Sequence, residues 1–359
     1  QDNMDVCNDT TTLTRVTGQI ENPLTGEEVE GVEILLNGQV ETQTASDGLY
    51  SVTTPTRVSD VELSGYNNSN PLNGVSTADI VAIQRHLLGK EAFTSGYQLI
   101  AADVNNNADV SAADLIALRQ VILGMEVDFM RYNGQTSWRF ADQGENLSDN
   151  MSPWPFTEVL GEDEILAQLG SGNFHGIKIG DVTGDAKSNG LTGSTTRGDN
   201  GQVTLSIQEV ELVAGERYTM EVRSEDFAEV SGYQYTMEFD ATVLNFTGVQ
   251  GGVLEVSHGN VGTSQVSQGL ITMSWNDLTG EAVSVSSDKV LFTVTFDVLA
   301  DAKASEAVSL NSLVTKAEAY DAELNVKGLN LEFRNGAQVV EVFDLHQNVP
   351  NPFKSSTVI

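Results

Sequence analysis

Basic residues and cysteine are scarce in this chain. Only 18 lysine and arginine residues stand against 51 aspartate and glutamate residues, so the formal net charge at pH 7 is −33. A surface this negative repels phosphate backbones and anionic lipid headgroups, which disfavours nucleic-acid and peripheral membrane partners, and divalent cations are its natural counterions. The apolar runs fall short of the ~20 residues that a membrane span needs. We therefore expect no membrane span, and calcium as the cofactor.

A single cysteine, Cys7, excludes a disulfide or a cysteine-based zinc cluster within the chain. Two interpretations of Cys7 stay open: a disulfide to a preceding domain, or a free thiol. The 4 histidines lack the i, i+4 spacing of a helical metal site, and no nucleophile elbow or phosphate loop is present. The 51 acidic residues leave carboxylate pairs for glycoside hydrolysis open. Because every segment fits a non-catalytic module, we expect no catalytic residues and no enzymatic activity.

Most of the chain has a β pattern. Short β-branched runs separated by Asn37-Gly38 and Asp47-Gly48 turns predict a small sandwich over residues 14–66. Alternating runs at 203–207, 218–223, 232–239, 271–275, 290–299 and 329–333 predict a larger antiparallel sandwich over residues 202–333. The fold class is therefore multidomain and mostly β, with two antiparallel β-sandwiches flanking a small α-helical, EF-hand-like module.

An internal repeat supplies the helices of that module. Residues 74–90 align without gaps on residues 109–125, and both copies have a serine N-cap, an aspartate three residues later and a C-terminal Leu-Gly. Apolar residues recur at i, i+3 and i+7, as Ile80, Ile83 and Leu87 in the first copy and Leu115, Leu118 and Ile122 in the second. This spacing predicts two helices of about three turns whose apolar stripes face each other.

Oxygen-bearing residues precede the second helix at the spacing of a calcium loop. The candidate ligands are Asp103, Asn105, Asn107, Asp109 and Asp114. Alternate side chains of a tight loop converge on one point, and calcium takes about six to eight oxygen ligands. The sixth position of such a loop is normally glycine and is Ala108 here. We expect a calcium site with a lowered affinity or a slightly different turn.

Two further segments are weaker calcium candidates. The loop before the first helix has Leu72 where an oxygen is needed, so we assign Asn70, Asn73 and Asp79 to a weak or remodelled first site. Asp181, Thr183 and Asp185 repeat the loop spacing without a following helix, and form a candidate third site.

Aromatic residues in the segment 126–193 allow two readings. Trp138, Phe140, Trp154 and Phe156 could form a sugar-stacking platform or pack into a core. We expect core packing, because large aromatics in a loop-rich segment usually provide its core.

The two loop–helix repeats, over about residues 68–125, resemble a dockerin, the calcium-dependent module that docks into cohesin domains. The resemblance implies contact through a helix face, with Gln84, Arg85, Arg119 and Gln120 as candidates. The alternative is that these are solvated helix positions. The strand patterns at 230–246 and 290–296 resemble those of cohesin domains. A cohesin/dockerin-type contact could then form in cis or with another copy.

Both ends of the chain carry further resemblances. The strings at 16–20, 31–34 and 44–50 resemble carboxypeptidase-regulatory-like spacer domains. The string Gln-Asn-Val-Pro-Asn-Pro-Phe at 347–353 resembles the opening of the C-terminal sorting domain of Bacteroidetes type IX secretion cargo. This second resemblance implies export by the type IX secretion machinery to the cell surface or the extracellular space.

These assignments give a domain plan and a function. The plan is a linker from an upstream domain (1–13), a carboxypeptidase-regulatory-like sandwich (14–66), a dockerin-like calcium module with a loop-rich extension (67–187), a linker (188–201), a cohesin-like sandwich (202–333), and a linker with the start of a sorting domain (334–359). We expect a non-catalytic structural or adhesive protein, made rigid by calcium and self-assembling head-to-tail into surface filaments. The alternative is a scaffolding component that recruits a cohesin-bearing partner or a polysaccharide-degrading enzyme.

Overall fold

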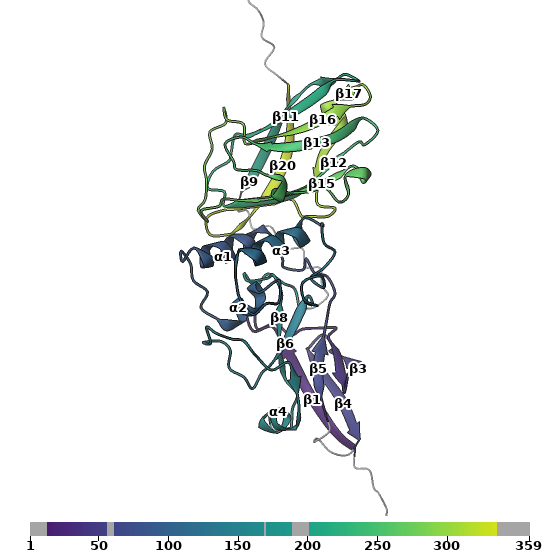
Figure 1. Ribbon diagram of the computed structural model, residues 1–359, viewed down its shortest axis with the longest axis vertical. Helices are drawn as coiled ribbons and strands as arrows, with labels where there is room; N and C mark the ends of the chain where they lie inside the picture. Colours follow the sequence, from purple (N-terminus) through teal and green to yellow (C-terminus); the bar gives the residue numbers. More distant parts are fainter. Residues whose placement is uncertain (1–12, 56–60, 169, 189–200, 336–359) are drawn as a thin grey trace, which may run out of the picture.

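The computed structural model describes residues 13–55, 61–168, 170–188 and 201–335. Figure 1 shows an elongated molecule with a large β-sandwich at one end, two helices across the middle and a smaller group of strands at the other end. The chain is thus mostly β with a small helical region, as predicted. Among the described residues, no helix is long and apolar enough to cross a membrane. Cys7, residues 189–200 and residues 336–359 lie outside the described part, together with the predictions made for them.

Two four-stranded sheets form the N-terminal end, in the orders β4-β1-β8-β6 and β3-β2-β5-β7. Their strands are β1 (Leu13–Glu21), β2 (Glu33–Leu36), β3 (Gln39–Gln43), β4 (Leu49–Pro55), β5 (Leu63–Tyr66), β6 (Trp138–Asp142), β7 (Val159–Leu160) and β8 (Phe174–Lys178). One core joins Val16 and Ile34 to Trp138, Phe140 and Phe174. The first two aromatics of the extension therefore pack into a core, as expected. The segment 14–66 shares both of its sheets with residues 138–178.

The predicted helix pair is present. Helix α1 (Thr77–Leu87) and helix α3 (Ala112–Ile122) each begin with a serine N-cap and a capping box, in which the aspartate at the third helical position accepts the N–H of the N-cap residue. Gly89 and Gly124 follow these helices with φ of 67° and 63°. Only glycine adopts this left-handed conformation without strain, so each helix ends where the Leu-Gly pairs predict.

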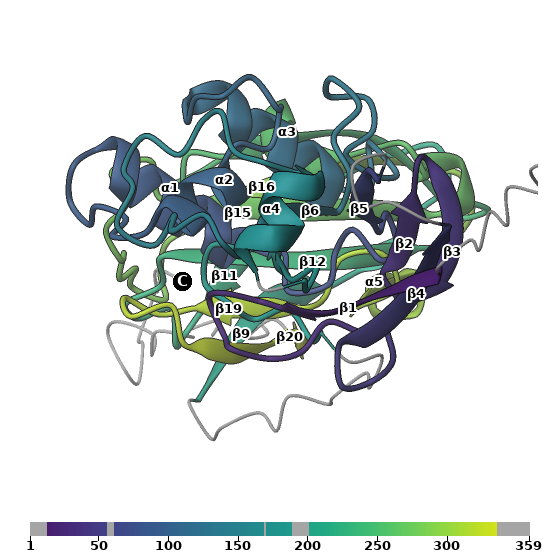
Figure 2. The same cartoon turned by 90° about the horizontal axis from the view of Figure 1, so that it is seen from below.

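A second core lies between the helices and the N-terminal sheets. It contains Ile80 and Ile83 of α1, Leu118 and Ile122 of α3, and residues of the short helix α2 (Gly96–Ala102). Ile177 of β8 belongs to the same core, which fixes the helix pair on the N-terminal sheets. A fourth helix, α4 (Glu162–Ala167), packs near β7. In Figure 2, seen along the long axis, strands β2, β3 and β4 lie to one side of α1 and α3.

The C-terminal sandwich is built almost entirely from antiparallel strands. Its elements are β9 (Gln202–Glu209), β10 (Glu211–Leu212), β11 (Arg217–Ser224), β12 (Gly232–Phe239), β13 (Leu244–Gly251), η2 (His258–Asn260), β14 (Val261–Gly262), η3 (Val266–Gln268), β15 (Leu270–Asn276), β16 (Phe292–Val298), β17 (Ala302–Lys303), α5 (Ala304–Ala307), β18 (Val308–Asn311), β19 (Glu318–Tyr320) and β20 (Val326–Asn335). Strands β9 and β20 pair in parallel. Tyr233, Tyr235, Trp275, Phe292 and Phe296 fill the core.

Candidate docking interface and calcium loops

Strands β12 and β15 of the C-terminal sandwich are buried on both faces. Side chains alternate between the two faces of a strand, and the apolar residues at 233, 235 and 237 enter the sandwich core. The opposite face carries cross-strand polar pairs, with Gln234 beside Ser274 and Thr236 beside Thr272. These four side chains are between 0% and 4% exposed. Such alternation usually marks a sheet with one solvated face, so something must cover the polar face here.

Helix α1 covers this face with its N-terminal turn. The N–H of Thr77 donates to Oε1 of Gln234 at 2.7 Å, and the Thr77 hydroxyl lies 2.8 Å from the same oxygen. The Thr77 hydroxyl also lies 2.7 Å from the hydroxyl of Ser274. The first N–H groups of a helix have no partner within the helix. The sandwich therefore supplies a hydrogen-bond acceptor that the helix itself lacks.

Further along α1, two side chains reach the end of β15 and the loops that follow β15 and β19. Gln84 donates through its amide to the carbonyl of Leu278 and accepts from the amide of Asn276. Arg85 donates through Nε to the carbonyl of Gly280 at 2.9 Å and through Nη2 to the carbonyl of Ala322 at 2.8 Å. These contacts fix both the rotation and the position of α1 along the sheet.

Helix α3 is held at its C-terminal end. The carbonyls of Ile122, Leu123 and Gly124 accept hydrogen bonds from the hydroxyls of Thr315 (2.6 Å), Thr272 (2.7 Å) and Ser264 (2.8 Å). The last carbonyls of a helix are as unpaired as its first N–H groups. Three hydroxyls of the sandwich thus satisfy three backbone acceptors at one helix end.

Two glycines of the sandwich allow this close approach. A Cβ atom on Gly232 would lie 3.0 Å from Cγ2 of Thr77, and one on Gly262 would lie 2.4 Å from the carbonyl oxygen of Leu123. The second contact is with backbone, which cannot rotate away. Side chains at these positions would therefore push the helices off the sheet.

Three of the four predicted contact residues lie in this interface. Gln84 and Arg85 make the bonds described above, and Arg119 of α3 donates to the side-chain oxygen of Asn276. Burial lowers the pKa of Arg119 to about 10, which leaves it charged at neutral pH. The fourth, Gln120, instead accepts a hydrogen bond from the hydroxyl of Tyr132. The N-terminal contacts of α1 through Thr77 were not anticipated, although its position beside a serine N-cap was visible in the sequence.

The loop 103–114 folds around two buried carboxylates. Asp103 accepts the N–H groups of Asn107 and Ala108, both at 2.9 Å. Asp114 accepts the N–H of Asn105 at 3.0 Å through one oxygen and that of Ser111 at 2.9 Å through the other. The backbone of Ala108 has a φ of 63°, so the sharp turn normally made by glycine is kept by a strained alanine.

The donor set of this loop suits a hard cation. The side-chain oxygen of Asn105 is buried without a hydrogen-bond partner. Burial raises the pKa of Asp103 and of Asp114 above the usual range of a carboxyl group. Both features indicate buried oxygen atoms that the protein does not fully satisfy, and carboxylate and amide oxygens are the ligands that calcium prefers.

Asp79 of the first candidate site lies against residues of the third candidate site. It accepts the N–H groups of Val182 and Thr183 at 3.0 and 3.1 Å, and the hydroxyl of Thr183 at 2.9 Å. Asn73 pairs with the backbone of Lys187 through both of its amide atoms. The structure therefore brings the aspartate of the first candidate site to the residues of the third.

Asp79 and the loop 181–186 form a second cluster, which has the same hydrogen-bonding pattern as the loop 103–114. Asp181 accepts the N–H groups of the residues four and five positions later, Asp185 at 3.0 Å and Ala186 at 2.9 Å. Asp79 accepts the N–H of Ser76 at 2.9 Å, as Asp114 does with Ser111. The loop 181–186 therefore packs against the start of α1 in the same way as the loop that begins at Asp103 packs against the start of α3.

Burial dominates the electrostatics of this cluster. It raises the pKa of Asp79, which the neighbouring charge of Asp181 raises further, and it raises the pKa of Asp181 itself. The buried amine of Lys178 donates to the carbonyls of Pro71 and Ile179 at 2.8 and 3.0 Å, and burial lowers its pKa to about 7. Within the described ranges, no group of three or more His, Cys, Asp or Glu side chains is placed to hold a metal ion. Amide and hydroxyl oxygens would have to complete either site.

The C-terminal sandwich matches a known family. Residues 203–332 match the cohesin domain model. The chain therefore contains a cohesin domain. Similar solved structures include a type I cohesin–dockerin complex from Clostridium thermocellum, with 14% identity, a TM-score of 0.30 and coverage of 37% of this chain and 100% of that chain. A type II cohesin from Bacteroides cellulosolvens has 17% identity, a TM-score of 0.29 and coverage of 37% and 95%. No curated protein matches the chain.

The predicted cohesin-like sandwich is thereby confirmed, and the interface described above lies on the cohesin domain. The only module that the comparisons identify is non-catalytic. The dockerin-like, carboxypeptidase-regulatory-like and sorting-domain assignments stay predictions.

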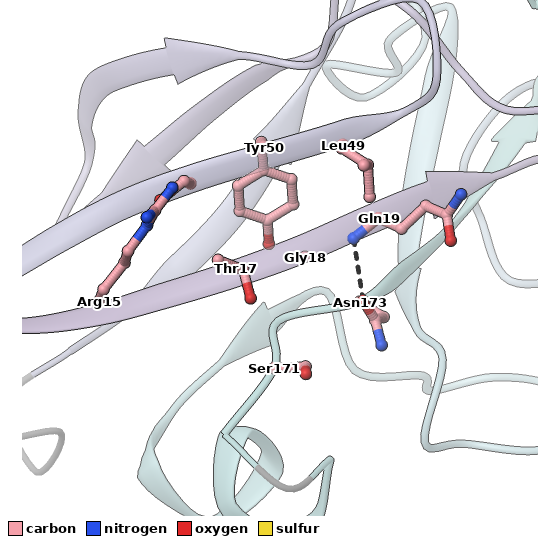
Figure 3. A pocket seen from close by; sticks show the side chains of 9 residues that line it. Arg15, Thr17, Gly18, Gln19, Leu49, Tyr50, Ser171 and Asn173 are labelled. Atoms are coloured by element: carbon pink, nitrogen blue, oxygen red, sulfur yellow. Dashed lines mark hydrogen bonds between the residues drawn. The ribbon is translucent and has the colours of Figure 1, made fainter.

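A groove of about 570 Å³ lies over β1 and β4, at the far end from the cohesin domain. Figure 3 shows its walls, where Asn173 accepts the N–H of Gln19 at 2.9 Å. The Arg15 guanidinium donates to the hydroxyl of Ser51 at 2.6 Å, and the Tyr50 hydroxyl donates to the carbonyl of Gly172. Because these polar groups are paired with one another, we assign no ligand to this groove.

Proposed function

We propose that this chain is a non-catalytic extracellular structural protein whose cohesin domain binds the dockerin-like helical module of the same chain. The observation that carries the proposal is the burial of the polar face of β12 and β15 under α1 and α3. Gln84, Arg85 and Arg119, which the dockerin resemblance marks as contact candidates, are engaged there. The contact would join the modules of the chain into one stiff, elongated body.

Calcium is the second part of the proposal. Asp103, Asn105, Asn107 and Asp114, with the backbone carbonyl of Asp109, would supply oxygen ligands in the loop 103–114. In the second cluster, the carboxylates of Asp79 and Asp181 and the hydroxyl of Thr183 would supply them. A bound cation offsets the repulsion between buried carboxylates and couples ion binding to the folding of a small helix pair. Calcium would thereby stabilise the helices that cover the cohesin domain.

The intramolecular contact bears on both assembly models. With its polar face covered in cis, the cohesin domain would form head-to-tail filaments only if the helices were exchanged between copies, as in domain swapping. Recruitment of an external cohesin-bearing partner or a polysaccharide-degrading enzyme would likewise require Gln84, Arg85 and Arg119 to leave their present bonds. The geometry favours the contact within one chain.

Export through type IX secretion and attachment to the cell surface are proposals that rest on the residues 347–353. They agree with a structural role outside the cell, where calcium is plentiful. Adhesion to a surface or ligand would then use faces other than the covered one.

A protease site inserted between residues 188 and 201 tests the proposed contact. After cleavage, we expect the two fragments to elute together in calcium and to separate in a chelator. The Thr77→Arg, Arg119→Glu variant should separate in both buffers, while Gln120→Ala should behave as the parent chain. Fragments of the parent chain that separate in calcium would refute the intramolecular contact, and external recruitment would then be the better model.

A further inference from the structure

The loop 103–114 is held from outside by a segment that does not belong to the two repeats. Residues 133–139 follow the second repeat and run into β6, whose Trp138 packs in the core of the N-terminal sheets. Three side chains of this segment donate hydrogen bonds to the first half of the loop. These donors, which we call the brace, are Asn133, Gln135 and Arg139. The loop is thereby attached to the N-terminal sheets as well as to α3.

Two members of the brace bind backbone carbonyls of the loop. The amide of Gln135, a residue that is 1% exposed, donates to the carbonyl of Asp103 at 2.9 Å. The amide of Asn133 donates to the carbonyls of Asn105 and Asn106 at 2.9 and 3.4 Å. These bonds fix the orientation of three peptide groups in the part of the loop that carries the candidate ligands Asp103 and Asn105.

The third member, Arg139, holds Asn106 in a left-handed conformation. Asn106 has a φ of 54°, and its side-chain oxygen accepts from Nη1 of Arg139 at 2.7 Å. The amide of Asn106 donates to the carbonyl of Asn133 at 3.3 Å. The guanidinium itself lies over the ring of Phe156 and donates to both carboxylate oxygens of Glu158, at 2.6 and 2.5 Å. A guanidinium paired in this bidentate way has a fixed geometry, so Asn106 is bound to a rigid group.

We propose that the brace keeps the loop 103–114 in its folded shape before an ion binds. The loop has reason to unfold without support, because Asn106 and Ala108 have a positive φ without being glycine and because the carboxylates of Asp103 and Asp114 are buried. A site that is already shaped loses less conformational entropy when it binds its ligand. The brace therefore raises the calcium affinity of this loop, a consequence that rests on the calcium site of the proposed function.

Nitrogen relaxation of the full-length chain in a chelator measures the loop without an ion. In the unmodified chain, we expect order parameters of about 0.85 for the amides of residues 105–108, as in rigid backbone. Arg139→Lys keeps the positive charge but loses the bidentate pair and the bond to the loop. Asn133→Gly removes a donor at a φ of 51°, which glycine adopts freely. Both variants should lower these order parameters to below about 0.6, whereas Arg131→Lys, in an exposed ion pair, should leave them unchanged.

Calorimetric titration with calcium measures the consequence for affinity. We expect Arg139→Lys and Asn133→Gly to weaken the ion of this loop by about tenfold, because groups behind metal ligands commonly have effects of this size. Asp114→Asn identifies which ion belongs to the loop. The ion at Asp79 and Asp181 is the internal reference and should keep its affinity, since a general loss of stability in the helical module would weaken both ions.

Three results would overturn the proposal. The amides of residues 105–108 could be as mobile in the unmodified chain in chelator as in the variants. Arg139→Lys and Asn133→Gly could leave the loop as rigid as it is in the unmodified chain. Both variants could also weaken the two ions equally. An unmodified chain that binds no calcium would refute the calcium site of the proposed function, and the order parameters in chelator would still decide the role of the brace.

Discussion

At the scale of single residues, Ala108 shows how a local departure from a motif is resolved. The sequence predicted that alanine at this position would either weaken the site or change the turn. The structure keeps the turn and places Ala108 at a φ of 63°, where its N–H donates to Asp103. The left-handed conformation costs a non-glycine residue roughly 1–2 kcal/mol. The departure therefore affects stability, while the turn is kept.

Ala108→Gly should stabilise the chain. Relief of the strained backbone outweighs the extra entropy of glycine in the unfolded chain, and we expect a net gain of about 0.5–1 kcal/mol in the free energy of unfolding. Urea denaturation in a chelator measures this value. Ala82→Gly in the middle of α1, where φ is helical, should lower the free energy of unfolding by about 1 kcal/mol. Equal effects at both sites would contradict the strain at Ala108.

Thr77→Val should weaken the interface between α1 and the cohesin domain. Valine has nearly the same shape but leaves the hydroxyl of Ser274 without this buried partner. We expect a loss of about 1–3 kcal/mol in the free energy of unfolding. Thr94→Val, at an exposed position, is the matched control and should change it by less than about 0.5 kcal/mol. A loss at position 77 no larger than that of the control would mean that this contact is not formed in solution.

At the scale of elements, local sequence signals predicted the helices but not the segments that pack against them. Serine caps, first-turn aspartates and Leu-Gly stops act within one turn, so the ends of α1 and α3 could be predicted from the sequence. The loop that packs against Asp79 comes from residues 181–186, far along the chain. The sequence did contain a signal for this pairing. The first helix follows a loop that lacks the calcium-loop spacing, and the loop at 181–185 has that spacing but no helix after it. No pattern within either segment predicts that this helix and this loop pack together.

The number of calcium ions tests this pairing. The sequence offered three candidate sites, whereas the structure joins Asp79 and Asp181 in one cluster, so we expect two ions per chain by calorimetric titration. Asp79→Asn and Asp181→Asn should each remove the same ion, and their combination should do no more. Asp114→Asn should weaken the other site by about tenfold or more. Three bound ions, or additive losses from Asp79→Asn and Asp181→Asn, would contradict a shared site.

The C-terminal end of α1 contains a pH-sensitive contact. His86 stacks on Phe93 and accepts its N–H through Nδ1 at 3.0 Å, and burial lowers the pKa of the imidazole. A lowered pKa means that the unfolded chain takes up the proton first, so the contribution of His86 to stability is lost as pH falls below about 6.5. His86→Gln keeps an acceptor without a titrating charge. Between pH 7.5 and 5.5, the free energy of unfolding of the parent chain should therefore fall relative to that of the variant. A difference between the two that does not change with pH would refute this.

At the scale of the whole molecule, the sequence predicted the modules and left their arrangement open. Alternation along β12 and β15 gave the strands and the core, because an apolar face is a local pattern. Such alternation is typical of a sheet with one solvated polar face, and the structure buries this face. Contacts between Gln234, Ser274 and Thr77 join residues from distant segments. The resemblance to a cohesin and a dockerin left open whether the two modules contact each other within one chain or between two copies. The structure shows how the contact can form within one chain.

The most direct measurement uses the ion pair between Lys90, just after α1, and Glu281 in the loop after β15. A carbodiimide reagent joins an amine to a carboxylate in direct contact, and mass spectrometry identifies the linked peptides. An equal mixture of chains with normal and heavy nitrogen separates links within one chain from links between two. We expect to find the Lys90–Glu281 link, with both linked peptides carrying the same nitrogen isotope. The link should be lost in the Glu281→Gln variant. Linked peptides of mixed isotope, or no link at this pair, would contradict a cohesin domain covered by the helices of its own chain.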